Sequence, residues 1–401
     1  MKISVLLPTR NRLELLRHAV ESVRRQEDDD WEVVISDNDS EEDIRGYVES
    51  LEDERVRYLR APRPLPVTEN WNNALAAAEG EYVIMLGDDD ALLSGYFATI
   101  RRLVTTFSEP EVIYHSALLY AYPSVLPEAP NGYLKPYDYA PFFRDAHVPY
   151  VLDRGRAREL VDTAMDFRVV YGFNMQFVTV SRRIIEELER DGAFYRSPFP
   201  DYYAMNMLFL RAPRIVVEPR PCVVIGVSPK SYGFYYANRR EREGKTMLDG
   251  GDDMEQAASN DALLPGSNIN NGWLQAMEAV GDATRGVFDV RPNLRRYRML
   301  QLAYVHQGYF LDHQVSREQL RELHDHMRLW ERVVYGSVGR LAGVLASSSG
   351  LLDRAVRDAL RRALKQLPSW NPPNDPRRFE HILEVCERFD AESDPAVAQA
   401  R

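Results

Sequence analysis

Cysteine is nearly absent from this chain. Its 401 residues include two, Cys222 and Cys386, which lie far apart and form no Cys-x-x-Cys pair. This excludes a disulfide scaffold and a thiolate zinc site, and it favours a reducing compartment. Long apolar runs are also missing, since residues 3–7 are too few for a signal-peptide core or a membrane-spanning helix. We therefore expect a soluble cytoplasmic protein, with peripheral contact at the inner membrane face left open.

An excess of basic residues is missing as well. The chain has 50 Lys and Arg residues against 61 Asp and Glu residues, a net charge of −11. This argues against a nucleic-acid partner, but a local cation or a metal would still allow an anionic small ligand. The content of hydrophobic residues, 45%, is ordinary for a globular protein. At about 150 residues per domain, the length predicts two or three units, or one large domain with an appendage.

Short apolar strands alternate with amphipathic helices over the first hundred residues. We expect strands at residues 3–7, 31–35, 56–59 and 82–86, and helices at 12–25, 41–51 and 68–78. This order is typical of an α/β protein with a parallel sheet and helices on both faces. Polar residues that follow the strands would meet at the carboxyl edge, where such sheets bind ligands.

The rest of the chain divides by composition. Residues 120–150 are rich in Pro and Tyr and predict a long loop, and strand and helix signals then continue to about residue 230. Residues 231–270 are polar and Gly-rich, which indicates a flexible loop or linker. Helical patterns dominate residues 271–401. We therefore predict an α/β domain over 1–230 and a helical C-terminal region.

Three acidic residues, Asp88, Asp89 and Asp90, directly follow the strand at 82–86. Their mutual repulsion calls for a cation, and Mg²⁺ binds one or two carboxylates together with phosphate oxygens. Mn²⁺ accepts the same ligands. A solvated acidic turn before the next helix is the alternative, because a helix N-terminus favours anions.

Two other strand ends carry polar groups. Thr9 and Arg10 follow the first strand, and Arg10 is either a phosphate ligand or an ordinary surface residue. Asp37 and Asn38 follow the second strand, where they could read a base or ribose by hydrogen bonds or form an Asx turn.

Taken together, these motifs resemble family 2 glycosyltransferases of the GT-A fold. The matching segments are residues 3–11, 32–40 and 72–90, in the same order and with similar spacing. The resemblance covers residues 1–115 well and 116–230 loosely, and it does not reach the C-terminal region. It implies a Rossmann-like mixed, mostly parallel sheet, with a nucleotide-sugar-binding half at 1–115 and an acceptor-binding half at 116–230.

The resemblance implies a metal-dependent, inverting transfer from a nucleotide-diphosphate sugar to a hydroxyl of a saccharide or lipid-linked acceptor. Its product would be a polysaccharide, a glycolipid or a glycosylated natural product. Asp89 would be the main ligand of Mn²⁺ or Mg²⁺, with Asp90 and Asp88 close by. The donor would meet the following residues: Pro8, Thr9, Arg10, Asp37, Asn38, Asn72, Asp88 and Lys230.

Two departures from the family pattern concern the donor site. Gly87 stands where many members have Asp, and Trp71 stands where many have a basic residue. The cation that faces the diphosphate is therefore unassigned. Arg10, Lys230 and the loop after Ser228 are the candidates.

Asp201 is the candidate general base. It opens a predicted helix in Phe199-Pro200-Asp201, at the place where inverting members carry a carboxylate, with Pro200 where Glu is common. It would accept the proton of the acceptor hydroxyl. The alternative is a helix-stabilising carboxylate.

The sequence also leaves two alternative functions and two alternative contacts of one C-terminal segment to be decided. A nucleotidyltransferase usually has a Gly-rich basic loop after its first strand, which this chain lacks, and a non-catalytic nucleotide-binding scaffold would not need Asp201. The segment 330–365 combines apolar residues with arginines. It would either lie on an anionic membrane or pack on the core or on a second copy of the chain, giving a homo-oligomer.

Overall fold

The computed structural model describes residues 1–126, 129–238, 263–364 and 378–393, and the chain forms two compact units. The first contains residues 1–161, 171–252 and 370–401, and the second contains 162–170 and 253–369. Of the predicted flexible segment 231–270, residues 239–262 lie outside the described part. Its start is helical, as α8 (Tyr232–Ala237).

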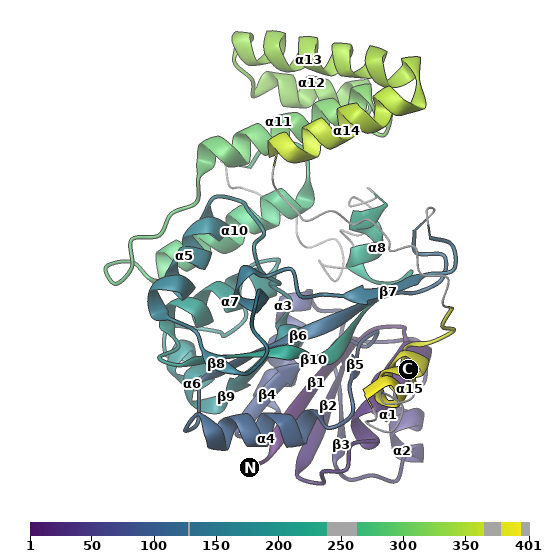
Figure 1. The fold of residues 1–401 in the computed structure, drawn as a ribbon, viewed down its shortest axis with the longest axis vertical. Coiled ribbons are helices and arrows are strands. Elements are labelled where there is room, and N and C mark those ends of the chain that lie inside the picture. Colours follow the sequence, from purple (N-terminus) through teal and green to yellow (C-terminus); the bar gives the residue numbers. More distant parts are fainter. Residues whose placement is uncertain (127–128, 239–262, 365–377, 394–401) are drawn as a thin grey trace. The chain divides into compact units, whose positions relative to one another are not determined.

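A ten-stranded mixed sheet forms the centre of the first unit (Figure 1). Its strand order is β3-β2-β1-β4-β9-β6-β10-β5, with β7 beside β6 and β8 beside β10. The strands are β1 (Ile3–Thr9), β2 (Trp31–Asp37), β3 (Val56–Arg60), β4 (Tyr82–Met85), β5 (Ala91–Leu92), β6 (Val112–Ala121), β7 (Tyr133–Pro136), β8 (Tyr150–Val151), β9 (Val178–Ser181) and β10 (Ile215–Val227). The predicted α/β class and its four N-terminal strands are confirmed.

Parallel pairing joins β3, β2, β1 and β4, and it also joins β6 and β10. Strand β9 lies between the two groups and is antiparallel to both β4 and β6. The long loop predicted at 120–150 is wrong in part, because β7 and a short 3-10 helix at Pro141–Phe143 lie within it. Antiparallel pairing with β6 orders β7, a contact that the local sequence does not encode.

Helices connect the strands of this unit. They are α1 (Leu13–Arg24), α2 (Ile44–Ser50), α3 (Val67–Ala76), α4 (Tyr96–Thr106), α5 (Arg154–Met165, which continues into the second unit), α6 (Arg182–Glu189), α7 (Pro200–Arg211), α8 and α15 (Ile382–Ser393). Helix α1 shows why the predicted helices form, since Leu16, Val20 and Val23 recur at helical spacing and are all buried.

The last helix, α15, packs on α1, β5 and β10, although the sequence groups it with the C-terminal helices. The hydroxyl of Tyr120 donates a 2.8 Å hydrogen bond to the carbonyl of Phe379, just before α15. The rings of His18 and His381 lie 4.7 Å apart. The first unit therefore includes chain segments from both ends of the sequence.

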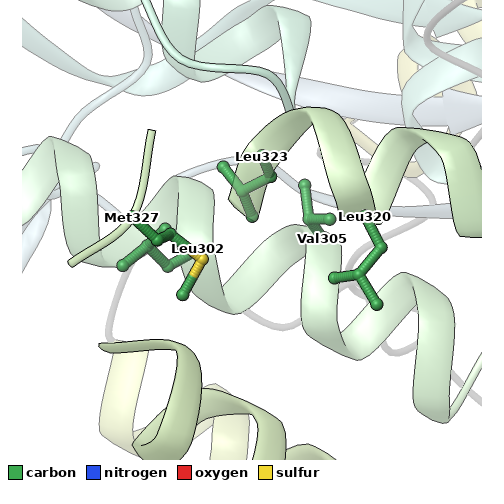
Figure 2. Packing of buried hydrophobic residues seen from close by; sticks show 5 residues of the cluster. All are labelled: Leu302, Val305, Leu320, Leu323 and Met327. Atoms are coloured by element: carbon green, nitrogen blue, oxygen red, sulfur yellow. The ribbon is translucent and has the colours of Figure 1, made fainter. Parts of the chain in front are cut away.

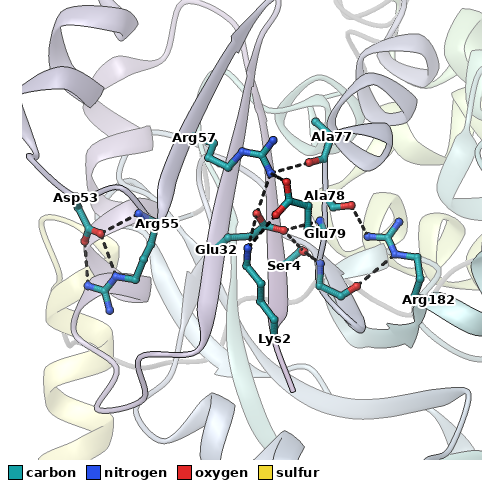
Figure 3. Close-up of polar contacts among 11 residues, drawn as sticks. Lys2, Ser4, Glu32, Asp53, Arg55, Arg57, Ala77, Ala78, Glu79 and Arg182 are labelled. Atoms are coloured by element: carbon teal, nitrogen blue, oxygen red, sulfur yellow. Dashed lines mark hydrogen bonds and ion pairs between the residues drawn. The ribbon is translucent and has the colours of Figure 1, made fainter.

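A buried carboxylate, Glu32, joins the strands at the amino edge of the sheet (Figure 3). It accepts hydrogen bonds of 2.6 Å each from the Ser4 hydroxyl and the Glu79 backbone N–H. Arg57 and Lys2 also pair with it, at 3.0 and 3.2 Å. Burial alone raises the pKa of Glu32, but these donors outweigh burial and lower that pKa to about 2. Glu32 is thus paired with donors and cations of the protein itself.

The second unit is helical. Its helices are α10 (Asn268–Ala283), α11 (Leu294–Phe310), α12 (Arg317–Asp325), α13 (Leu329–Ser348) and α14 (Gly350–Leu364). Figure 2 shows a core in which Leu302 and Val305 of α11 meet Leu320 and Leu323 of α12, and Met327 closes it. Within the part of the chain that the structure describes, no helix has the length and apolar character needed to cross a membrane.

Candidate functional site

The acidic triplet lies at the carboxyl edge of the sheet, after β4. Asp88, Asp89 and Asp90 are all buried, at 2, 6 and 2% exposure. They therefore do not form the solvated turn that was the alternative interpretation. Buried carboxylates need hydrogen bonds or cations, and the triplet finds them on the segment after β1, at the end of β10 and within its own turn.

Asp88 is held by the chain that follows β1. The Thr9 hydroxyl donates to its Oδ2 at 2.7 Å, and the Arg12 guanidinium pairs with its Oδ1 at 2.8 Å. Burial on its own lowers the pKa of Arg12, but Asp88 and then Asp89 raise it above its ordinary value. Arg12 also donates to the carbonyl of Lys230. The cation beside the triplet is thus Arg12, which sequence reasoning missed although it stands two residues after Arg10.

The end of β10 holds the other two carboxylates. Ser228 donates to Asp89 Oδ2 through its hydroxyl at 2.8 Å and its backbone N–H at 3.3 Å. Asp90 accepts the backbone N–H groups of Gly87 and Gly226, both at 2.8 Å. Only glycine fits at 226, because a Cβ there would lie 1.8 Å from the Asp89 carbonyl oxygen. No local sequence signal marks Ser228 or Gly226 as partners of residues more than 130 positions away.

The charge of this cluster is not balanced. Burial raises the pKa of Asp89, and burial together with the neighbouring Asp89 raises the pKa of Asp90 well above its ordinary value. Beside them, the Tyr122 hydroxyl is buried and finds no hydrogen-bond partner among the described residues. Burial and then the charge of Asp89 raise the pKa of Tyr122. The site therefore holds excess negative charge and an unsatisfied polar group, features that favour a cationic or polar ligand.

The predicted metal can be tested against the donor atoms. In the described part of the chain, no three or more His, Cys, Asp or Glu side chains surround a common metal position. Both oxygens of Asp88 and of Asp90 accept hydrogen bonds from the chain. Asp89 Oδ1 accepts none from the described residues. One open carboxylate oxygen fits Mg²⁺ or Mn²⁺ that takes its other ligands from phosphate and water.

Asp37 and Asn38 lie at the end of β2. Asp37 is buried and accepts hydrogen bonds from the Tyr58 hydroxyl at 2.7 Å and the Ser40 backbone N–H at 2.9 Å. Arg60 pairs with it at 3.3 Å. The Asn38 amide exchanges two hydrogen bonds with the backbone of residue 65, at 2.9 and 2.7 Å. These contacts shape the loop at 61–66, and a role in base recognition stays a prediction.

The other residues predicted to bind the donor have different partners in the structure. Lys230 is exposed and donates to the carbonyl of Asn11 at 2.8 Å, next to Arg12. Pro8 and Arg10 flank Thr9 and are partly exposed. Asn72 on α3 instead exchanges hydrogen bonds of 2.9 and 3.1 Å with the backbone of residue 195. Asn72 thereby anchors the segment that leads into α7.

Asp201 stands in the first turn of α7 and is partly buried. Burial raises its pKa to about 7, although the Tyr202 backbone N–H, which donates to it at 2.9 Å, opposes this shift. A carboxylate with a pKa near 7 is half ionised at neutral pH, as a general base requires.

Aromatic contacts link α7 to the segment that follows Ser228. The rings of Phe199 and Tyr232 lie 5.6 Å apart, and Phe199 also contacts Tyr202. On the other side, Tyr202 lies 4.6 Å from Phe173. The start of α7, which carries Asp201, is therefore packed against the start of α8, four residues after the partner of Asp89.

Comparison with known proteins finds similarity over the N-terminal part of the chain. Residues 4–151 match the profile described as Glycosyl transferase family 2. The GalNAc(5)-diNAcBac-PP-undecaprenol beta-1,3-glucosyltransferase of Campylobacter jejuni is 40% identical over 104 residues, which are 25% of this chain and 34% of that protein. The putative colanic acid biosynthesis glycosyl transferase WcaA of Escherichia coli K12 is 32% identical over 149 residues, which are 35% of this chain and 52% of that protein.

The structure of S. aureus TarS 1–349 with UDP-GlcNAc aligns with 91% of this chain and 88% of its own, at 15% identity and a TM-score of 0.48. We draw no functional conclusion from a likeness of this size. The chain spans between a third and about half of the two curated relatives. The profile match includes β1, the end of β2 and the acidic triplet. This part of the chain is therefore similar to glycosyl transferase family 2.

Proposed function

We propose that this protein transfers a sugar from a nucleotide-diphosphate sugar to a hydroxyl acceptor, with inversion at the anomeric carbon. The observation that carries the proposal is the pairing of two features in a family 2 domain. One is the buried triplet with the neighbouring guanidinium of Arg12, and the other is Asp201 with its pKa raised to about 7. The first suits a metal and diphosphate, and the second suits a base.

In the proposed reaction, Asp201 accepts the proton of the acceptor hydroxyl while that oxygen bonds to the anomeric carbon. The bond from that carbon to the diphosphate oxygen breaks, and the electron pair leaves with the nucleotide diphosphate. Attack from the face opposite the leaving group inverts the configuration. Segment 195–197, which Asn72 and Thr68 hold by hydrogen bonds, positions the start of α7 and so the base.

At the donor end, Asp89 is proposed to hold Mg²⁺ or Mn²⁺, with Asp88 and Asp90 fixing the surrounding turn. When bound, the metal neutralises charge that develops on the diphosphate. Arg12 adds a second positive charge, and its bond to Asp88 fixes the guanidinium in place. Lys230 lies on the neighbouring segment and is proposed to contact the phosphates from the exposed side.

The acceptor is proposed to be a lipid-linked saccharide. This rests on the Campylobacter jejuni relative, whose name gives an undecaprenyl-diphosphate-linked saccharide as its substrate.

Calorimetry of UDP, GDP, dTDP and CMP binding, with and without Mn²⁺, tests the donor site. We expect one nucleoside diphosphate to bind only with the metal, and Asp89→Asn to lose this binding. Asp201→Asn is the matched control, because it should bind the nucleotide normally and lose transfer. Failure of the wild type to bind any nucleotide would refute the proposal. A second outcome would also count against the proposed reaction. If the wild type binds the nucleotide only with metal, but Asp201→Asn hydrolyses the donor sugar as fast as the wild type does, a different reaction is favoured.

A further inference from the structure

Helix α13 carries its large apolar side chains on the side that faces away from its own unit. The exposed residues are Trp330, Val333, Val334, Val338, Leu341, Val344 and Leu345. Their separations of one, three and four residues keep them on one side of the helix, so they form a stripe along it. The exposure is large, with Leu341 at 62% and Val344 at 64%. We call these seven residues the α13 stripe.

The opposite side of α13 is the packed one, and its residues are small. Gly339 and Gly343 lie against Phe310 of α11, and a Cβ at these positions would come within 2.5 Å of the Phe310 ring and 2.8 Å of its carbonyl oxygen. Glu331 is buried there and pairs with Arg298 of α11 at 2.6 Å. Helix α13 therefore packs on α11 through the side that carries its small residues, and the α13 stripe is not part of the core.

The charge around the α13 stripe differs in sign from the rest of the chain. Residues 328–364 contain seven arginines and three acidic residues, whereas the whole chain has a net charge of −11. Two of the acidic residues, Glu331 and Asp353, are already paired with arginines. Arg340 beside the stripe, and Arg354 and Arg362 on the neighbouring α14, are exposed.

We propose that the α13 stripe and its arginines bind the surface of an anionic lipid bilayer. An apolar stripe about 23 Å long, from residue 330 to 345, suits a helix that lies in the interface with its apolar side chains among the acyl chains. Arginine side chains reach outward from such a helix to anionic headgroups. The aromatic ring of Trp330 at one end of the stripe suits the headgroup level.

Charge favours the bilayer over a second copy of the chain. In a twofold contact, the same patch faces itself, so the arginines on both copies would be brought together. A bilayer supplies the opposite charge. The inference goes beyond the proposed transfer reaction, because it concerns residues outside the family 2 domain and its test measures binding rather than turnover.

The test is sedimentation of the full chain with two kinds of vesicle, phosphatidylcholine alone and an equal mixture of phosphatidylcholine and phosphatidylglycerol. We expect partition into the anionic vesicles to be at least about tenfold stronger and to fall with salt. The double variant Val334→Glu/Leu341→Glu should lose this binding. Val287→Glu is the matched control, because Val287 is 68% exposed in the same unit but lies outside the stripe.

A spectroscopic readout makes the test independent of charge. Trp330 emission should shift to the blue on vesicle binding, and the shift should be lost in Trp330→Phe while sedimentation largely persists. Circular dichroism of each variant checks that the helices are intact. Equal binding of the double variant and the wild type, or no binding to anionic vesicles, would overturn the proposal. So would light scattering that shows a wild-type dimer and a monomeric double variant.

Discussion

Buried carboxylates lie at both edges of the same sheet, and their pKa values shift in opposite directions. At the amino edge, Glu32 has four donors that include Lys2 and Arg57, and its pKa falls to about 2. At the carboxyl edge, the cation that pairs directly with the triplet is Arg12, on Asp88, and the pKa values of Asp89 and Asp90 are raised.

The comparison of the two edges shows that burial alone does not decide the protonation state of a carboxylate. Burial raises the pKa at both edges, and the supply of donors and cations then determines the outcome. At the amino edge, Glu32 is paired within the protein, and its contacts join β1, β2, β3 and the turn before β4. At the carboxyl edge, the negative charge of the triplet is not balanced by the protein, which lowers the stability of the folded state. Functional sites often contain such destabilising features.

The largest expected effect is at Asp201. Asp201→Asn should lower kcat by about 10³-fold, within the range for loss of a general base, with nucleotide binding unchanged. Because the base acts when ionised and its pKa is about 7, wild-type kcat should rise about tenfold per pH unit below pH 7 and level off above it. A pH–rate profile measures this, and a flat wild-type profile would exclude Asp201 as the base.

Asp89→Asn should weaken nucleotide binding and at the same time make the folded protein more stable. Loss of the charge should weaken metal-dependent nucleotide binding by at least about 100-fold. The same change should raise the free energy of unfolding at pH 7, because a buried carboxylate with a raised pKa disfavours the folded state when it is ionised. Denaturant unfolding without metal checks the second effect. A loss of stability would show that the carboxyl edge is balanced after all.

Glu32→Gln should have the opposite effect to Asp89→Asn, lowering stability and leaving activity unchanged. It removes the charge that Arg57 and Lys2 face, so the free energy of unfolding should fall by about 3 kcal/mol at pH 7, with kcat unchanged. The folded-state pKa is lowered to about 2, so the contribution of Glu32 is present above pH ~4.3 and declines as pH falls toward 2. Wild type and variant should therefore converge between pH 4 and 2. A constant difference would contradict the ionic origin of the effect.

The smallest expected effects come from two matched hydroxyls. Thr9 donates to Asp88 at 2.7 Å, and Ser4 donates to Glu32 at 2.6 Å. Thr9→Val should lower the free energy of unfolding by about 1 kcal/mol. Ser4→Ala should lower it by about 2 kcal/mol, since the Ser4 hydroxyl also accepts the Gly80 backbone N–H. Urea unfolding of both variants measures the difference. A larger loss of stability for Thr9→Val than for Ser4→Ala would contradict the view that the amino edge contributes more to stability than the carboxyl edge.

Prediction from the sequence succeeded where the signal was local. Strands β1 to β4 and the helices between them follow from apolar periodicity, and the position of Asp88–Asp90 follows from the strand just before them. It did not reach contacts that join distant segments. Arg12 pairs with the triplet, and the amide of Asn72 exchanges hydrogen bonds with the backbone of residue 195, while the donor-binding roles of Arg10 and Asn72 stay predictions. Neither contact is visible without knowing which way each side chain points.

The sequence by itself determined the α/β order, the family motifs and the collection of acidic residues at one edge of the sheet, because these depend on neighbours along the chain. Only the tertiary structure decided their electrostatic state. Ser228 and Gly226 reach Asp89 and Asp90 across the sheet, and α15 docks on α1 from the far end of the chain. The pKa shifts and the α13 stripe likewise depend on which atoms are buried together, and folding fixes that through contacts between residues distant in sequence.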